Sequence, residues 1–311
     1  MKTMRVMCVV LVGVLAWCAI RGWADAPTTP STAAARPAGP TLNVLLATAA
    51  KLVPLQQKMD KPKPGDWLAT YPEAGQTFEA YRDSKPNRPT AEHTTLYIQP
   101  LGDFTKPQQR LIDDTADFLG RFYGVPVKQL DPVALDTIKG RRNNPHTGQL
   151  QLLSTYILDR VLLPRRPKDA VAVLGLTAVD LYPEASWNFV FGQASLVERV
   201  GVWSIYRYGD PVKEYPTVLR RTLKVSVHET GHMFGIQHCI AYKCGMNGSN
   251  SLEEADRQPM PFCAECDPKI WWACGLEPVK RYGSLAEFAE KHELKAEGEY
   301  WRKAEAAVKG K

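Results

Sequence analysis

The chain has 311 residues, of which 44% are hydrophobic, which suits one sizeable globular domain or two small ones. Its formal charge of +6 comes from 39 basic and 33 acidic residues, with no dominant block of Lys or Arg. The composition therefore predicts neither a nucleic-acid groove nor a patch for anionic membranes, and we expect a monomer.

The first segment has the layout of a secretory signal peptide. Two basic residues precede an uncharged apolar run over residues 6–20, and small residues follow it. This run of about 15 residues is shorter than the roughly 20 that a membrane-spanning helix needs. We predict a signal peptide over residues 1–26, cleaved after Ala26, and a secreted or periplasmic protein without membrane insertion. A lipid anchor at Cys18 is disfavoured, because the bulky Trp17 precedes it.

The segment that follows, residues 27–41, is rich in Pro, Ala and Thr and indicates an extended linker. Strand-like and helix-like patterns then alternate. We expect a strand at residues 94–99, a helix around 111–122, another helix at 150–163 and a buried strand at 170–176. This alternation predicts an α/β (α+β) fold with a twisted mixed β-sheet packed by helices.

Two further strand candidates, residues 188–193 and 197–206, precede a helix that is expected to begin near Pro216. We expect the first of them to be an edge strand that lies along a cleft, where it could hold an extended substrate by β-pairing. The apolar face of the helix repeats every three or four residues. It consists of Leu219, Leu223, Val227, Thr230 and Phe234.

This helix carries the sequence HETGH, in which His228 and His232 are four residues apart. Side chains at this spacing project from one helix face and can bind one zinc ion. Glu229 points differently and could reach a zinc-bound water as a general base. Gly235 can end the helix, so that His238 returns as a third ligand and leaves the fourth position open, as in catalytic sites.

A second cluster consists of cysteines. Of the seven cysteines two lie in the predicted signal segment, and the other five all fall in the last quarter of the chain. Four of them form C-x4-C and C-x2-C pairs that suit a closed, structural zinc site. They are Cys239, Cys244, Cys263 and Cys266. Two disulfides are the alternative, and Cys274, the fifth, could replace Cys266 as a ligand.

These motifs resemble the archaemetzincin (archaelysin) family of the metzincin clan, whose pattern HExxHxxGxxH runs directly into C-x4-C-x-M and closes with CxxC. Here it stands as HETGHMFGIQHC, IAYK, CGM and CAEC, and the segments GLTAVDLYP and FVFGQA also match. The resemblance covers roughly residues 67–272. It implies a metzincin-like zinc peptidase that acts on peptides or proteins, with Met246 in the turn beneath the site.

By the same resemblance the chain binds two zinc ions. The catalytic ion is held by His228, His232 and His238, with Glu229 as the base. The structural ion is held by Cys239, Cys244, Cys263 and Cys266. The metallopeptidase domain is then expected over residues 42–311, as an N-terminal subdomain over about 42–235 and a smaller zinc-bound subdomain over about 236–311.

One alternative remains at this point, a non-catalytic binding module that uses both zinc ions only for its architecture. Residues 284–308 predict a charged amphipathic surface helix, with His292 as a surface residue. The sequence suggests no role for Arg207, Tyr208 or Glu214.

Overall fold

The structure is a computed structural model that describes Val9–Val10 and residues 41–310. The predicted signal peptide at residues 1–26 and the linker at 27–41 therefore lie almost entirely outside the described residues. Among the helices of the described part of the chain, none has both the length and the apolar composition that a membrane span requires.

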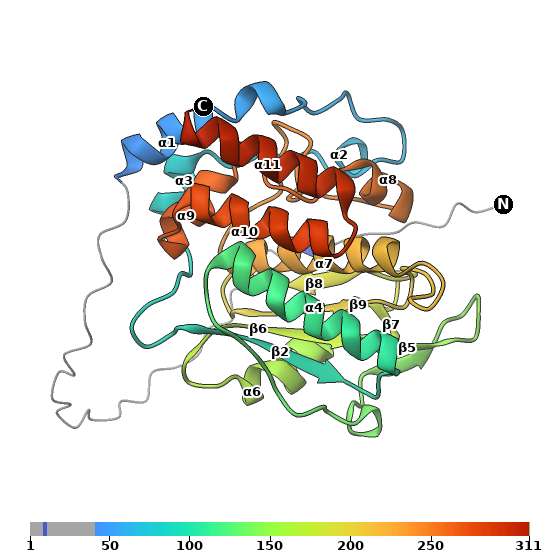
Figure 1. Cartoon of the computed structure of the whole chain (residues 1–311). Helices are drawn as coiled ribbons and strands as arrows, with labels where there is room; N and C mark the ends of the chain where they lie inside the picture. Colours follow the sequence, from blue (N-terminus) through green and yellow to red (C-terminus); the bar gives the residue numbers. More distant parts are fainter. Residues whose placement is uncertain (1–8, 11–40, 311) are drawn as a thin grey trace, which may run out of the picture.

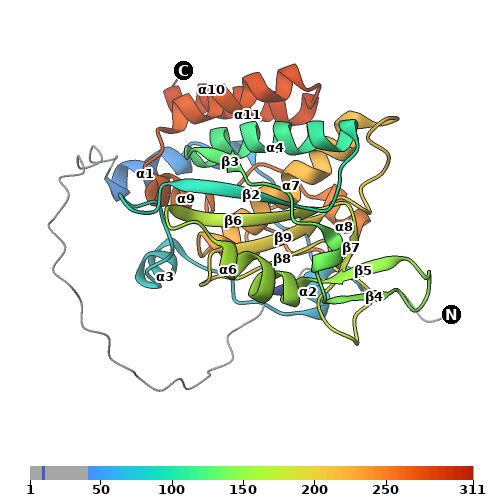
Figure 2. The same cartoon turned by 90° about the horizontal axis from the view of Figure 1, so that it is seen from below.

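A mixed sheet forms the centre of the described part (Figure 2). Its strands, in their order across the sheet, are β1 (Val9–Val10), β8 (Gly192–Ala194), β9 (Val200–Ser204), β6 (Ala170–Thr177), β2 (Thr95–Leu101) and β3 (Val127–Gln129). β8 and β9 are antiparallel, whereas the other neighbouring pairs are parallel. β2 and β6 are buried along their whole length, as expected for apolar strands that are covered on both faces.

Helices cover both faces of this sheet (Figures 1 and 2). One face packs against α4 (Lys106–Tyr123) and α7 (Tyr215–Met233), with α10 (Pro278–Lys291) and α11 (Lys295–Lys309) beyond them. The other face packs against a continuous helical segment made of α5 (Ser154–Tyr156), the π-helical η3 (Ile157–Leu162) and α6 (Leu163–Arg165). Because side chains alternate along β2, Leu96 and Ile98 join the first core while Tyr97 joins the second. The predicted mixed sheet packed by helices is confirmed.

The N-terminal segment packs against the C-terminal part of the chain (Figure 1). Its elements are α1 (Leu42–Ala50), η1 (Val53–Leu55), α2 (Trp67–Thr70) and α3 (Phe78–Asp83). The C-terminal part also contains α8 (Leu252–Arg257) and α9 (Asp267–Cys274), and α9 contacts both α1 and α3. The remaining elements are η2 (Leu135–Thr137) and a small sheet of β4 (Arg141–Asn143), β5 (Leu150–Leu153) and β7 (Asp180–Tyr182). One core cluster extends from Leu45 to Val308.

Two helix predictions are wrong in part. Residues 150–163 begin as a strand, because β5 pairs with β4 and β7 before the chain turns into a helix. Residues 284–308 form parts of two helices, since Glu293 takes a left-handed φ of 60° and ends α10. His292 is not a surface residue: it is 7% exposed and its ring stacks on Phe288, with the centroids 4.2 Å apart.

The prediction of an edge strand at residues 188–193 is wrong in its bounds and in its position. β8 begins only at Gly192, because the residues before it bond elsewhere: Val190 pairs with Leu181, and the carbonyl of Asn188 accepts from the side chains of Arg142 and Gln151. Within the described residues β1 pairs with the outer side of β8, so β8 is not at the edge.

Candidate metal centres

Helix α7 carries two of the predicted histidine ligands close to its C-terminal end. The predicted apolar face is buried, and the helix packs against β6, β8 and β9. The helix ends where the sequence predicts, because Gly235 has a φ of +82°. A Cβ atom there would lie 2.7 Å from Cβ of Pro86, so glycine is required both for the backbone and for the contact. The chain then turns back toward the helix.

The three histidines converge. Their ligand nitrogens lie within 4.8 Å of one another, and Nε2 of His228 is 3.0 Å from Nε2 of His232. The Nδ1 atoms of these two rings lie 2.9 Å from the carbonyl oxygen of Gly245 and 2.7 Å from that of Ile236. Because a carbonyl only accepts, each Nδ1 carries the proton and each Nε2 offers a lone pair. Two facing lone pairs cannot hydrogen-bond each other, and they fit a shared cation.

The third histidine, His238, also donates from Nδ1 and leaves Nε2 free to face the cluster, but its acceptor is a side chain and not a backbone carbonyl. His238 donates from Nδ1 to Oε1 of Glu73 at 2.8 Å, and its Nε2 is buried without a hydrogen-bond partner. The same Glu73 oxygen accepts a bond of 3.0 Å from Nε1 of Trp67. Burial by itself raises the pKa of Glu73, but the hydrogen bond and charge of His238 outweigh it and lower that pKa. Three orphaned nitrogens are the donor set of a zinc site.

Burial sets the protonation states in this cluster. It lowers the pKa of His228 to about 3, with a further contribution from the neighbouring His238, and it lowers the pKa of His232 well below its usual value. Both imidazoles are therefore neutral near pH 7, which is the state that binds metal.

The carboxyl group of Glu229 lies in a dry environment beside the histidines. The residue is 2% exposed, its Oε1 has no hydrogen-bond partner, and burial raises its pKa to about 8. A cation on the histidines would act in the opposite direction, because it favours the carboxylate. The carboxyl group lies against β8: a Cβ atom at Gly192 would be 2.6 Å from Oε1 of Glu229.

The four predicted cysteine ligands also meet. Their sulfurs lie within 4.8 Å of one another, and all four side chains are buried. Sγ of Cys239 and Sγ of Cys263 are 3.6 Å apart, close to the roughly 3.8 Å that a tetrahedral site with Zn–S bonds of about 2.3 Å implies. Hydrogen bonds from the other thiols, that of Cys244 first, lower the pKa of Cys239. None of the five cysteines in the described chain forms a disulfide, and Cys274 is not in the cluster.

The two centres share a loop. Cys239 directly follows His238, and its backbone N–H donates to the carbonyl of Met246 at 2.8 Å. Met246 is buried directly beneath α7, since a Cβ atom at Gly231 would lie 2.5 Å from its sulfur. The amide of Asn247 donates to the carbonyl of Cys239 and accepts from the backbone of Cys244. Met246 therefore packs against the helix that carries His228 and His232.

Sequence reasoning missed Glu73, Trp67 and Gly192, although the family resemblance reached the segments that hold all three. It also gave no role to Arg207, which forms a 2.6 Å ion pair with the buried Asp180. Asp180 in turn accepts a hydrogen bond from Gln151, which also holds the loop before β8. Arg207 therefore supports that loop and lies outside the histidine cluster.

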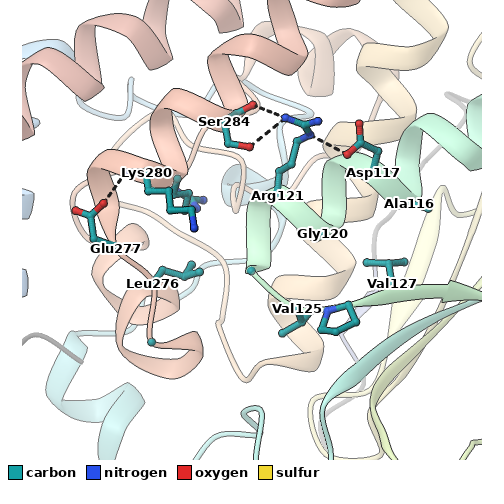
Figure 3. Close-up of a pocket in the computed structure, with 14 residues that line it drawn as sticks. Ala116, Asp117, Gly120, Arg121, Val125, Val127, Leu276, Glu277, Lys280 and Ser284 are labelled. Atoms are coloured by element: carbon teal, nitrogen blue, oxygen red, sulfur yellow. Dashed lines mark hydrogen bonds and ion pairs between the residues drawn. The ribbon is translucent and has the colours of Figure 1, made fainter. Parts of the chain in front are cut away.

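A cavity of about 810 Å³ lies elsewhere, between α4 and α10 (Figure 3). Arg121 faces it from α4 and is bonded to Asp117 and Ser284, while Lys280 and Leu276 line the opposite side. None of the histidines or cysteines of the two centres lines this cavity.

A family described as Peptidase family M54 matches residues 167–271 of the chain. Archaemetzincin-2 of Homo sapiens is 36% identical over 264 aligned residues, which cover 73% of this chain and 72% of that protein. The chain belongs to the archaemetzincin family. It is accordingly a zinc metallopeptidase, and the family and the enzyme class predicted from the motifs are confirmed.

Other archaemetzincins match a smaller part of the chain. The archaemetzincin of Thermococcus kodakarensis is 36% identical over 183 residues, covering 56% of this chain and 94% of that protein. The crystal structure of the archaemetzincin of Archaeoglobus fulgidus, complexed with malonate, has 32% sequence identity and a TM-score of 0.47. It covers 56% of this chain and 99% of that chain.

Proposed function

We propose that the chain hydrolyses peptide bonds in peptides or proteins at the histidine centre. The observation that carries this proposal is the convergence of three buried imidazoles on one point, with the carboxyl group of Glu229 buried beside them. Zinc in such a three-nitrogen site would keep an open position, polarise the scissile carbonyl and lower the pKa of water.

The role proposed for Glu229 is that of general base. Its carboxylate takes a proton from the attacking water and passes it to the nitrogen of the leaving amine. The absence of a hydrogen-bond partner at Oε1 supports this role, because no other group in the described structure competes for the proton.

We further propose a second, structural zinc on Cys239, Cys244, Cys263 and Cys266. Four buried sulfurs within 4.8 Å of one another would fill a tetrahedral site and leave no position for substrate. Because Cys239 is adjacent to His238, this ion would also fix the loop of the third histidine. The metal content per chain tests this proposal: two zinc ions support it, and one zinc ion argues against it.

The location and the mode of substrate binding are also proposals. The layout of residues 1–26 supports export, and loss of that segment would remove β1 and leave β8 at the edge of the sheet. Since Gly192 of β8 lies against Glu229, an extended peptide paired with this edge would pass beside the base. The subdomain boundary near residue 235 and the monomeric state remain predictions.

The decisive experiment incubates the purified protein with a mixed peptide library, with and without a chelator. We expect cleavage that the chelator abolishes, and we expect Glu229→Gln to lose it while its zinc content is unchanged. Undiminished turnover in that variant would remove Glu229 from the mechanism. A protein that binds both zinc ions but cleaves nothing would be the two-zinc binding module.

A further inference from the structure

We infer that Glu73 is a positioning residue for the third histidine, which holds the ring of His238 by Nδ1 so that Nε2 faces the metal. The inference deepens the proposed zinc site and rests on it. Glu73 lies 165 positions before His238 in the sequence, so this contact depends on how the N-terminal segment packs.

One carboxylate oxygen fixes two rings. Oε1 of Glu73 accepts both from His238 Nδ1, at 2.8 Å, and from Trp67 Nε1, at 3.0 Å. The Trp67 ring stands edge-on to the His238 ring, with the centroids 5.0 Å apart and the planes at 78°. Trp67 is 4% exposed, so the indole blocks the imidazole from swinging toward that side.

The three histidines differ in what orients them. His228 and His232 stand on a helix, and their Nδ1 atoms donate to main-chain carbonyls. His238 lies in irregular chain after the helix, and its acceptor is a charged side chain. A carboxylate is a stronger acceptor than a carbonyl, and it raises the basicity of the coordinating nitrogen. The least constrained ligand therefore has the strongest partner.

The segment that carries Glu73 is bound to the histidine loop before His238. Gln76 accepts from the backbone N–H of Gln237 at 3.2 Å and donates to the carbonyl of Gly235 at 3.1 Å. The ammonium group of Lys269 in turn donates to the carbonyl of Gln76.

An earlier part of the N-terminal segment, residues 57–59, is bound to the loop after His238. The backbone N–H of Met59 donates to the carbonyl of Ala241, and that of Lys243 donates to the carbonyl of Gln57. Contacts on both sides keep the carboxylate and the imidazole in register.

The backbone of Trp67 is fixed separately. Its N–H donates to Oε1 of Glu254 at 2.9 Å, and that carboxyl group also accepts from the backbone of Asn250 through Oε2. Gly248 lies so close that a Cβ atom there would be 2.5 Å from Cδ1 of the indole. The chain after His238 thus fixes Trp67, and Trp67 in turn helps to orient the carboxylate that holds His238.

The test is Glu73→Gln, which keeps the size of the side chain and removes its charge. We expect the zinc affinity of the histidine site, measured by competition with a chromogenic chelator, to fall about 10- to 100-fold. Zinc at the thiolate site should be retained. Substitution with Co²⁺ separates the two sites, because thiolate ligands give strong charge-transfer absorption whereas imidazole ligands give only weak d–d bands. The d–d bands should shift in the variant.

The matched control is Glu79→Gln, an exposed glutamate in the same N-terminal segment, which should bind zinc as the unmodified chain does. If Glu73→Gln keeps the original zinc affinity and Co²⁺ spectrum, Glu73 only packs and the inference is wrong. If the unmodified chain binds no metal at the histidines, the proposed zinc site itself fails and the inference fails with it. A loss confined to Glu73→Gln supports the inference.

Discussion

At Gly192 the absence of a side chain determines where the carboxyl group of Glu229 can lie. A Cβ atom at this position would come within 2.6 Å of Oε1, and a real side chain cannot approach an oxygen so closely. A methyl group at this position would therefore displace the Glu229 carboxyl group from the place that it occupies next to glycine. The proposed hydrolysis would depend on this contact, because a general base must lie within hydrogen-bond reach of the water.

We expect Gly192→Ala to lower kcat/KM by about 100-fold, the cost of displacing a reacting group by about 1 Å. Zinc content should not change, because the three atoms nearest to the new methyl group all belong to Glu229. Peptide cleavage and metal content, measured on the same preparation, check this expectation. Gly298→Ala in helix α11 is the control, because its Cβ atom would make only ordinary contacts, the nearest at 3.6 Å from Cβ of Ala289 in helix α10. Equal activity of the two variants would contradict the argument.

The local part of the site could be predicted from the sequence, because residues four apart on a helix share a face whatever surrounds them. This holds for His228 and His232, and the glycine after the helix led to His238. Glu73 and Gly192 could not be predicted in the same way, since each reaches its partner through tertiary packing of distant segments. No local spacing rule connects such residues.

At the level of elements, the position of His238 relative to helix α7 depends on the turn at Gly235 that ends the helix. Gly235 has a left-handed φ, which costs other residues about 1–2 kcal/mol, and a Cβ atom would also meet Pro86. We expect Gly235→Ala to lower the free energy of unfolding by at least about 1–2 kcal/mol and to weaken zinc binding. Denaturant unfolding and chelator competition measure the two effects. Zinc binding at the original affinity would show that the loop tolerates another helix end.

The contrast between local periodicity and tertiary pairing explains which helices and strands were assigned wrongly from the sequence. The helices with one clear apolar face, α4 and α7, were predicted, because burial follows their period directly. The assignment at residues 150–163 failed because pairing with β4 and β7 overrides the helical pattern of β5. The break between α10 and α11 depends on the left-handed Glu293, a residue type that gives no such signal.

At the scale of the whole molecule, one core connects the N-terminal helices, α7, the cysteine region and the last two helices. Loss of the metal that we propose at the cysteine site should therefore affect more than the loop that carries these cysteines. We expect Cys263→Ser to lower Tm by more than about 5 °C and to weaken zinc binding at the histidines, because Cys239 adjoins His238. Calorimetry with and without chelator checks the first effect. An unchanged Tm would mean that the cysteine region folds without metal.

The contact between Glu73 and His238 also determines how short a functional fragment of this enzyme can be. Residues 167–271, the stretch that matches the peptidase family, include the three clustered histidines, the four clustered cysteines and Glu229. They do not include Glu73 or Trp67. A fragment trimmed to that stretch would keep all the proposed coordinating atoms and lose the carboxylate that anchors His238. Recombinant versions intended for crystallisation or inhibitor screening should therefore begin no later than residue 41.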